Sequence, residues 1–261
     1  MQDRHENRKK YFYELATTSK EYFIPYIQKY KCIKKGMQVL EIGCGEGGNL
    51  LPFAQMGCHT LGIDLAKGRI DDANRFFSAC HAEGRFISSD IFNMDSMFHS
   101  FDIVICHDVM EHIADKQRLI SLMENFLSPD GVLFVSFPAW QMPFGGHQQI
   151  CRGKVVSHLP FIHLLPKPVY RKILSKESTA CIRELLSIRD TRTTVEMFEK
   201  LVLASHSLQT VNRTLFLINP HYKVKFGMRP RKLSSLIGNV PWLRNFFTSS
   251  CFYLCSVRKQ R

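Results

Sequence analysis

The sequence lacks several features that would assign a protein to a class at once. No stretch of its 261 residues approaches the roughly 18 uncharged apolar residues that a membrane-spanning helix needs. The start, MQDRHENRKK, has no apolar signal core, which argues against export. The nine cysteines are scattered without a C-x-x-C pair, so neither a disulfide framework nor a zinc site is predicted. We therefore expect free thiols in a cytoplasmic globular protein.

Acidic residues are missing from one end of the chain. Residues 200–261 carry eleven Lys and Arg and no acid, whereas residues 36–140 carry six basic and fourteen acidic residues. The net charge of the whole chain is +12. Such asymmetry indicates an anionic partner. It does not distinguish a small acid, a phosphorylated carrier, a membrane surface and RNA.

The hydrophobic pattern predicts an α/β fold. Residues 6–33 show helical spacing, with a helix start at Thr18 or Ser19. From residue 36 onward, strands alternate with helices, which predicts a doubly wound, mostly parallel sheet with helices on both faces. A turn is predicted at residues 128–131 and a helix through Glu111. The seven predicted strands are MQVLEIG, HTLGIDL, RFISSDI, FDIVICHD, VLFVSFP and residues 210–218 and 249–257.

Two segments interrupt the alternation of strands and helices. Residues 140–192 contain four prolines among aromatic and basic residues, and they predict a partly helical lid inserted after the fifth strand. Residues 223–247 form a second, basic insertion. The predicted organisation is an N-terminal helical cap over residues 1–35, followed by one α/β domain over residues 36–261.

The strongest motif is VLEIGCGEGG at residues 39–48, between a strand and a helix. Glycines there let the backbone turn sharply and approach a ligand. The spacing Gly43-x-Gly45-x-x-Gly48 also matches the dinucleotide fingerprint. Glu41 separates the two interpretations, because a buried acid would repel a pyrophosphate and needs a partner. A ligand with an ammonium group, such as the methionine half of S-adenosylmethionine, suits it.

Glu41-x-Gly43-x-Gly45-x-Gly47 resembles motif one of the class I S-adenosylmethionine-dependent methyltransferases, and FDIVICHDVMEHI at residues 101–113 resembles their motif four. The resemblance covers residues 36–138 and 194–257 and is of the methyltransferase-11/23 type. It implies S-adenosyl-L-methionine as cofactor, S-adenosyl-L-homocysteine as product, and a Rossmann-like fold. The implied cofactor-binding residues are Glu41, Gly43, Cys44, Gly45, Gly47, Asp64, Leu65, Asp90, Ile91 and His107.

Four of these residues have a specific expected contact. Asp64 ends the second strand and can accept hydrogen bonds from both ribose hydroxyls, although NAD enzymes use the same arrangement. By the resemblance, Asp90 would bind the adenine amino group while Ile91 packs on the ring. His107 would contact the methionine portion through its backbone carbonyl.

The loop after the fifth strand, AWQMPFGGHQQ, is placed to face the reacting methyl group, because ligands of open α/β sheets lie at the carboxyl ends of the strands. Trp140 and Phe144 could form apolar walls around the sulfonium. His147 could be a general base or an exposed turn residue, and His112 a base or a helix-capping residue. A histidine base weakly favours methylation of a hydroxyl. No metal site is predicted, since His107, Glu111 and His112 lack a metalloenzyme spacing.

Four functions remain open. The favoured one is methylation of a small-molecule, sugar-linked or lipid-linked acceptor. An RNA methyltransferase would use the basic surface, but no RNA-binding module is recognised. An NAD(P) oxidoreductase is disfavoured by Glu41, and a non-catalytic cofactor sensor is the fourth alternative. The basic insertions mix apolar and charged residues, which suits peripheral contact with a membrane, a lipid-linked anionic substrate, or a solvated face.

Overall fold

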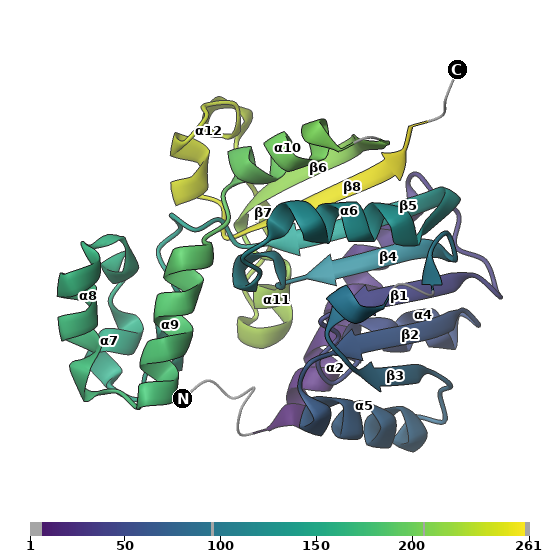
Figure 1. The fold of residues 1–261 in the computed structure, drawn as a ribbon, viewed down its shortest axis with the longest axis horizontal. Helices are drawn as coiled ribbons and strands as arrows, with labels where there is room; N and C mark the ends of the chain where they lie inside the picture. The colour runs from purple at the N-terminus through teal and green to yellow at the C-terminus, as the bar shows by residue number, and fades with distance from the viewer. Residues whose placement is uncertain (1–6, 95–96, 206, 259–261) are drawn as a thin grey trace.

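The computed structural model describes residues 7–94, 97–205 and 207–258. Its centre is an eight-stranded sheet in the order β3-β2-β1-β4-β5-β8-β6-β7 (Figure 1). The first five strands are parallel, and β8 lies antiparallel between β5 and β6. The doubly wound, mostly parallel sheet is thus confirmed. The strands are β1 (Gln38–Ile42), β2 (His59–Asp64), β3 (Arg85–Ser88), β4 (Phe101–His107), β5 (Leu127–Phe137), β6 (Leu208–Ile218), β7 (Arg231–Lys232) and β8 (Ser250–Val257).

The eighth strand, β7, has only two residues and pairs with the edge of β6. Two exposed basic residues carry no hydrophobic pattern, so the sequence predicted seven strands. Residues 128–131, predicted as a turn, fall within the bounds of β5, but they pair with no residue of β4 because the register shifts there from Leu127 to Val132. The turn therefore interrupts the pairing inside β5 and does not precede the strand. The predicted helix through Glu111 is only the single 3-10 turn of Met110–His112.

Helices cover both faces of the sheet because the central strands are apolar on both sides. Along β4, Ile103 and Ile105 enter one core cluster while Val104 and Cys106 enter the other. The first cluster includes side chains of α2 (Arg8–Thr18), α3 (Ile24–Gln28), α4 (Leu51–Gln55) and α5 (Lys67–Ala79). The second includes those of α6 (Lys116–Phe126) and α10 (Val195–Ala204).

The N-terminal segment is one continuous helical stretch. After α2 the helix widens to a π-helical turn, Ser19–Phe23, and continues as α3. The helix start predicted at Thr18 or Ser19 is therefore wrong. The hydroxyls that would have capped a helix instead donate to backbone carbonyls, Thr18 to Glu14 and Ser19 to Asn49. The Ser19 bond ties this segment to the connection after β1.

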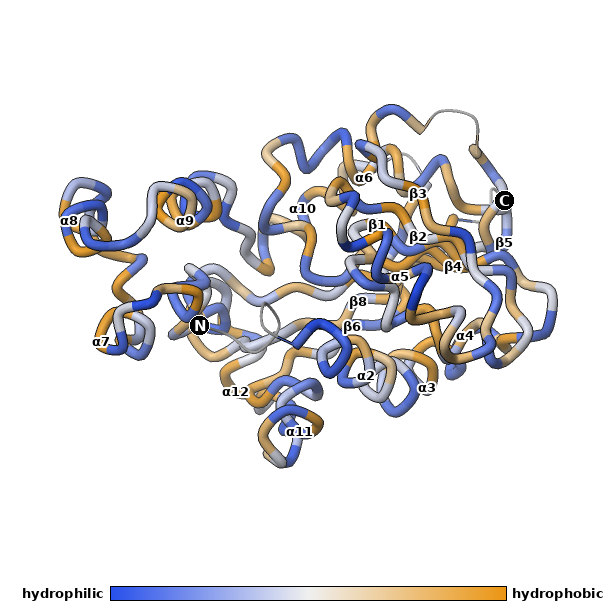
Figure 2. The backbone as a smooth tube through the Cα atoms, turned by 90° about the horizontal axis from the view of Figure 1, so that it is seen from below, coloured by the Kyte–Doolittle hydropathy of each residue, from blue (hydrophilic) through white to orange (hydrophobic). Residues whose placement is uncertain are grey.

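The lid predicted over residues 140–192 contains α7 (Lys154–His158), α8 (Lys167–Ile173) and α9 (Thr179–Thr191). These helices project from the body of the domain, beyond the carboxyl ends of the parallel strands (Figures 1 and 2). They enclose a small hydrophobic cluster of their own, formed by Cys151, Ile162, Tyr170, Leu174 and Leu185. The lid thus has a minor core separate from the two clusters on the sheet.

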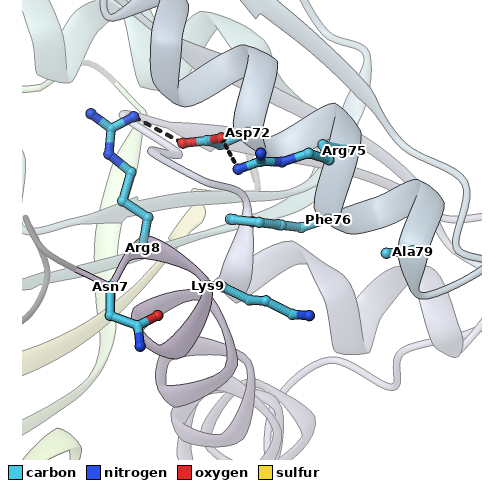
Figure 3. A pocket seen from close by; sticks show the side chains of 7 residues that line it. All are labelled: Asn7, Arg8, Lys9, Asp72, Arg75, Phe76 and Ala79. Atoms are coloured by element: carbon cyan, nitrogen blue, oxygen red, sulfur yellow. Dashed lines mark hydrogen bonds and ion pairs between the residues drawn. The ribbon is translucent and has the colours of Figure 1, made fainter.

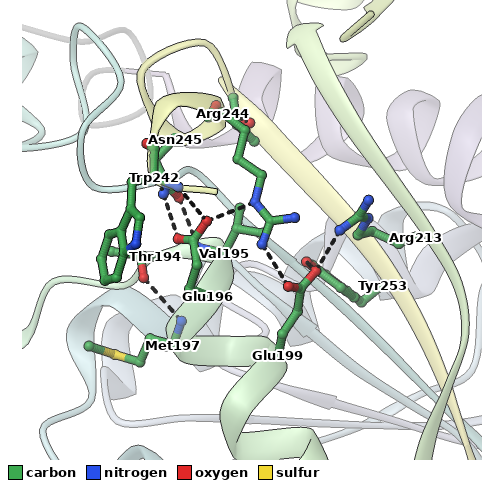
Figure 4. A network of polar contacts seen from close by, with 11 residues as sticks. Thr194, Val195, Glu196, Met197, Glu199, Arg213, Trp242, Arg244, Asn245 and Tyr253 are labelled. Carbon is green, nitrogen blue, oxygen red and sulfur yellow. Dashed lines mark hydrogen bonds and ion pairs between the residues drawn. The ribbon is translucent and has the colours of Figure 1, made fainter. Parts of the chain in front are cut away.

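The second insertion contains α11 (His221–Phe226), β7, α12 (Ser235–Gly238) and the 3-10 turn Leu243–Phe246. Arg244 fastens it to α10 (Figure 4). Its guanidinium donates to Glu196 at 2.8 Å and to Glu199 at 2.6 Å, and Asn245 donates to the other oxygen of Glu196 at 2.6 Å. No helix within the described residues is long and apolar enough to cross a membrane.

Candidate active site

The glycine loop after β1 has a backbone that side chains would disrupt. Gly43, Gly45 and Gly47 have φ angles of +67°, +52° and +81°, which only glycine adopts without strain. A Cβ on Gly43 would lie 2.3 Å from a methyl group of Val109. The amides of Gly43 and Cys44 donate to the carbonyl of Ile63, at 2.8 and 3.1 Å, and so fix the loop to β2.

Glu41 is the most unusual residue at this edge of the sheet. Its side chain is buried, and one carboxyl oxygen accepts a hydrogen bond from the Asn49 amide at 2.6 Å. The other oxygen, Oε2, has no hydrogen-bond partner among the described residues. Burial raises the pKa of Glu41 to about 8, with the nearby charge of Asp64 adding to the rise and the bond from Asn49 opposing it. A cationic ligand group would satisfy this carboxyl.

Asp64 holds the second half of the loop. One carboxylate oxygen accepts from the amide of Gly45 at 2.9 Å and the other from the amide of Ala66 at 2.8 Å. Each oxygen keeps a second lone pair for a ligand hydroxyl. The neighbouring Leu65 is 71% exposed. Cys44 is buried beneath the loop, so only its backbone can face a ligand.

The remaining predicted cofactor residues follow β3 and end β4. Asp90 is exposed and accepts a hydrogen bond from the amide of Phe92 at 3.0 Å, while Ile91 is buried. The His107 ring packs on Phe23, with 5.0 Å between ring centroids, and its side chain is 8% exposed. This packing leaves the His107 backbone as the group available at the strand tip. The binding roles of these residues stay predictions.

Helix α2 covers the glycine loop, which sequence reasoning did not foresee. A Cβ on Gly48 would lie 2.5 Å from the carbonyl oxygen of Phe12, so the helix and loop backbones are in direct contact. Arg8 at the start of α2 donates to Asp72 of α5 at 2.8 Å, beside a cavity of about 560 Å³ (Figure 3). Arg8 also lies 4.0 Å from the buried Glu46 of the loop. Helical spacing indicated the helix but not the surface that it covers.

A second cavity, of about 540 Å³, lies beyond the strand ends between the loop after β5, α7 and α11. His147 and Phe144, two of the residues predicted to contact the substrate, line this cavity. Their substrate role stays a prediction. Trp140 is not among the lining residues. It is buried, and its ring packs edge-on against His163 at 4.6 Å between ring centroids. The predicted role of Trp140 as a wall of the site stays a prediction.

His147 lies beside the residues that follow β4. Its φ is +57°, and its Nε2 lies 3.8 Å from the Glu111 carboxylate. The ring of His112 stands nearly perpendicular to that of His147, with 5.5 Å between centroids. The structure thus brings together both histidines that the sequence offered as bases. Residues far apart in the chain meet here because β4 and β5 are parallel neighbours.

Lys116 contributes positive charge to this region. It is buried, and its ammonium donates to the carbonyls of Ile113 and Thr191. Burial lowers the pKa of Lys116 to about 8, and the charge of Glu111 opposes that shift. Thr191 also donates to the carbonyl of Glu111, so the end of α9 is anchored to the segment that carries Glu111.

His221 of α11 is a cavity residue that sequence reasoning missed. Burial lowers its pKa to about 4, so its imidazole is neutral at pH 7. Its Nδ1 hydrogen-bonds the hydroxyl of Thr18 at 2.9 Å. Lys225, on the same helix, also lines the cavity. No sequence pattern indicated that α11 lines the cavity. This helix belongs to the second insertion, and only the folding of that insertion places it opposite the lid.

With this geometry in place, comparison with known proteins gives the family. Residues 33–184 match the family model described as a methyltransferase domain, and the chain belongs to this family. The prediction of a class I, Rossmann-like methyltransferase with S-adenosylmethionine as its cofactor is thereby confirmed. The fold agrees with this assignment, since a solved plantazolicin methyltransferase in complex with SAH aligns with a TM-score of 0.55. That alignment has 15% identity and covers 98% of this chain and 87% of the other.

Two curated relatives illustrate the range of similar proteins. An uncharacterised protein of Rickettsia prowazekii is 33% identical over 113 residues, which cover 40% of this chain and 20% of that protein. A ubiquinone biosynthesis O-methyltransferase of Bartonella tribocorum is 26% identical over 154 residues, which cover 57% of this chain and 62% of that protein. The chain thus matches less than two thirds of the length of each of these relatives.

Proposed function

We propose that this protein transfers a methyl group from S-adenosylmethionine to a hydroxyl oxygen of a small-molecule acceptor held in the cavity lined by His147. The observation that carries the proposal is the contact between His147 and Glu111 at the wall of that cavity, next to the strand ends where the cofactor is expected. The similarity to a ubiquinone biosynthesis O-methyltransferase supports oxygen as the acceptor atom.

On the cofactor side, Glu41 would accept the ammonium of the methionine portion through its unsatisfied oxygen. Asp64 would accept the ribose hydroxyls, and Asp90 with Ile91 would hold the adenine. The excess of acidic residues over residues 36–140 suits a ligand that carries a sulfonium and an ammonium. When bound, S-adenosylmethionine supplies an electrophilic methyl group on a positively charged sulfur.

On the acceptor side, His147 would take the proton of the hydroxyl as the oxygen attacks. The carboxylate of Glu111, 3.8 Å away, stabilises the imidazolium that forms. Phe144 and Met142 give the cavity an apolar part that excludes water, whereas Asp108 and Lys225 give it a polar part that orients the acceptor. Alignment of the two reactants supplies much of the rate enhancement.

The proposal is tested by His147→Ala with labelled S-adenosylmethionine and a small-molecule extract as the acceptor source. Loss of a general base should lower the rate of label transfer by about 100-fold or more. Binding of S-adenosylhomocysteine should stay unchanged, because His147 lies on the acceptor side. His59→Ala, at an exposed position at the start of β2, is the matched control and should keep full activity.

Two outcomes would contradict the proposal. One is full activity of both His147→Ala and His112→Ala, which would exclude a histidine base. The other is label that enters only RNA or is released by mild alkali as methanol, the behaviour of a methyl ester. Peripheral membrane contact and a lipid-linked acceptor stay predictions, motivated by the exposed Leu236 and Trp242 and by the exposed basic residues of β7, all within the second insertion.

A further inference from the structure

The lid brings together three side chains with metal-binding chemistry. Cys151 follows the 3-10 turn Gln148–Ile150 at the start of the lid, Glu177 precedes α9, and Cys181 lies in the first turn of α9. One sulfur or oxygen atom from each lies within 4.8 Å of the others. The two cysteines are far apart in the sequence, so their spacing gave no sign of a site. We propose that Cys151, Cys181 and Glu177 bind a Zn²⁺ ion that links the first part of the lid to the start of α9.

The carboxylate of Glu177 is held in position by the backbone. Its two oxygens accept hydrogen bonds from the amides of Arg152 and Gly153, at 2.9 and 3.0 Å. Each oxygen retains a lone pair for a metal. A Cβ on Gly153 would lie 3.0 Å from the Glu177 carboxylate, so the loop packs closely against this side chain. The backbone thus holds the Glu177 carboxylate near both sulfurs.

The donor set selects the metal. Two thiols and one carboxylate suit a borderline-soft ion such as Zn²⁺, which binds sulfur and oxygen together in tetrahedral sites, while Mg²⁺ and Ca²⁺ prefer oxygen alone. A water molecule would complete the four-coordinate site. A disulfide would use the two sulfurs alone, whereas a metal would also use the carboxylate that lies within 4.8 Å of them. The ion would therefore bind as Zn²⁺ with two thiolates and Glu177.

The hydrophobic cluster of the lid is small, so a metal ion would add to the stability of the lid. Its hydrophobic cluster contains only five buried side chains, one of them Cys151, and clusters of this size contribute little stability on their own. Gln149 and Ser157, close to Cys151 in the chain, line the cavity of His147. An ion at Cys151 would hold this wall of the cavity against α9.

The test uses all 261 residues of the chain, expressed without a polyhistidine tag and kept reduced with a phosphine. The wild-type protein should retain about one Zn²⁺ per chain after dialysis against zinc-free buffer, or, once stripped with a chelator, should take up about one Zn²⁺ per chain from added zinc salt. Co²⁺ in its place should give thiolate charge-transfer bands and the visible bands of a tetrahedral site. Cys181→Ser should lose both signals, and Glu177→Gln should weaken Co²⁺ binding about 10-fold or more. Cys32→Ser, an exposed cysteine outside the lid, is the control and should bind like wild type.

Circular dichroism of the zinc-free proteins shows whether each variant is folded, and Cys181 is only partly buried, so serine is tolerated there. Absence of Zn²⁺ and of thiolate–Co²⁺ bands in the folded wild-type protein would overturn the proposal. So would unchanged binding by Cys181→Ser, or a metal-free Cys151–Cys181 cross-link in unreduced protein. Because metal binding is the readout, the result is independent of the methyl-transfer proposal.

Discussion

Replacing Glu41 with glutamine is expected to stabilise the ligand-free protein and to weaken cofactor binding. The Glu41 carboxyl is buried with a pKa of about 8, above its ordinary value of 4.5. The folded chain therefore holds this proton more tightly than the unfolded chain, and stability falls as the pH rises from about 4.5 to about 8. At about 1.4 kcal/mol for each pH unit, the penalty reaches about 3 kcal/mol at pH 7.

Glutamine keeps the acceptor for Asn49 and has no proton to lose. Glu41→Gln should therefore raise the free energy of unfolding of the ligand-free protein by about 3 kcal/mol at pH 7 and remove this pH dependence. The same change removes the charge that we propose binds the ammonium. Affinity for S-adenosylhomocysteine should fall by about 10- to 100-fold, the value of a charged hydrogen bond.

The assay is urea unfolding of wild type and Glu41→Gln between pH 5 and pH 8, with and without S-adenosylhomocysteine. Glu83→Gln makes the same chemical change at an exposed position and should alter neither property. In the wild type, affinity for the product should itself fall about tenfold per pH unit below 8, because binding must first remove the Glu41 proton. A variant that is no more stable at pH 7 than wild type, or that binds the product equally well, would refute this account of Glu41.

Two further predictions concern the loop and the second insertion. The added Cβ of Gly43→Ala would lie 2.3 Å from Val109 at a φ of +67°, and this substitution should lower the free energy of unfolding by about 3 kcal/mol. Gly36 also has a positive φ, +85°, but no atom lies within 4 Å of its added Cβ, so Gly36→Ala should lower the free energy of unfolding by about 1 kcal/mol. Thermal unfolding measures both, and equal costs would mean that the loop relaxes. Arg244→Ala leaves the carboxylate of Glu196 without its guanidinium and should cost about 3 kcal/mol in urea unfolding. A loss below about 1 kcal/mol would mean that this network behaves as a surface ion pair.

The sequence predicted the sheet well because its signals are local. The apolar runs of β1, β2, β4 and β5 are buried on both faces, so each strand could be recognised without its neighbours. The sequence-based prediction failed where the bounds of a strand depend on its pairing with a neighbouring strand. Residues 128–131 have the composition of a turn, and they lie within the bounds of β5 but pair with no residue of β4. β7 exists only because the second insertion returns to the edge of β6.

The residues of the candidate site also fall into two groups, those recognised from a local sequence pattern and those brought together only by the fold. Glu41, the glycines and Asp64 could be found from the sequence, because a strand followed by a glycine loop carries its own spacing. The sequence alone therefore predicted the family, which the family model confirms, and a place for the methyl donor, which stays a prediction. Only the tertiary structure decided that His147 meets Glu111, that α2 covers the loop and that Cys151 meets Cys181. These contacts join segments far apart in the chain, and their geometry follows from how the lid and the helices pack on the sheet.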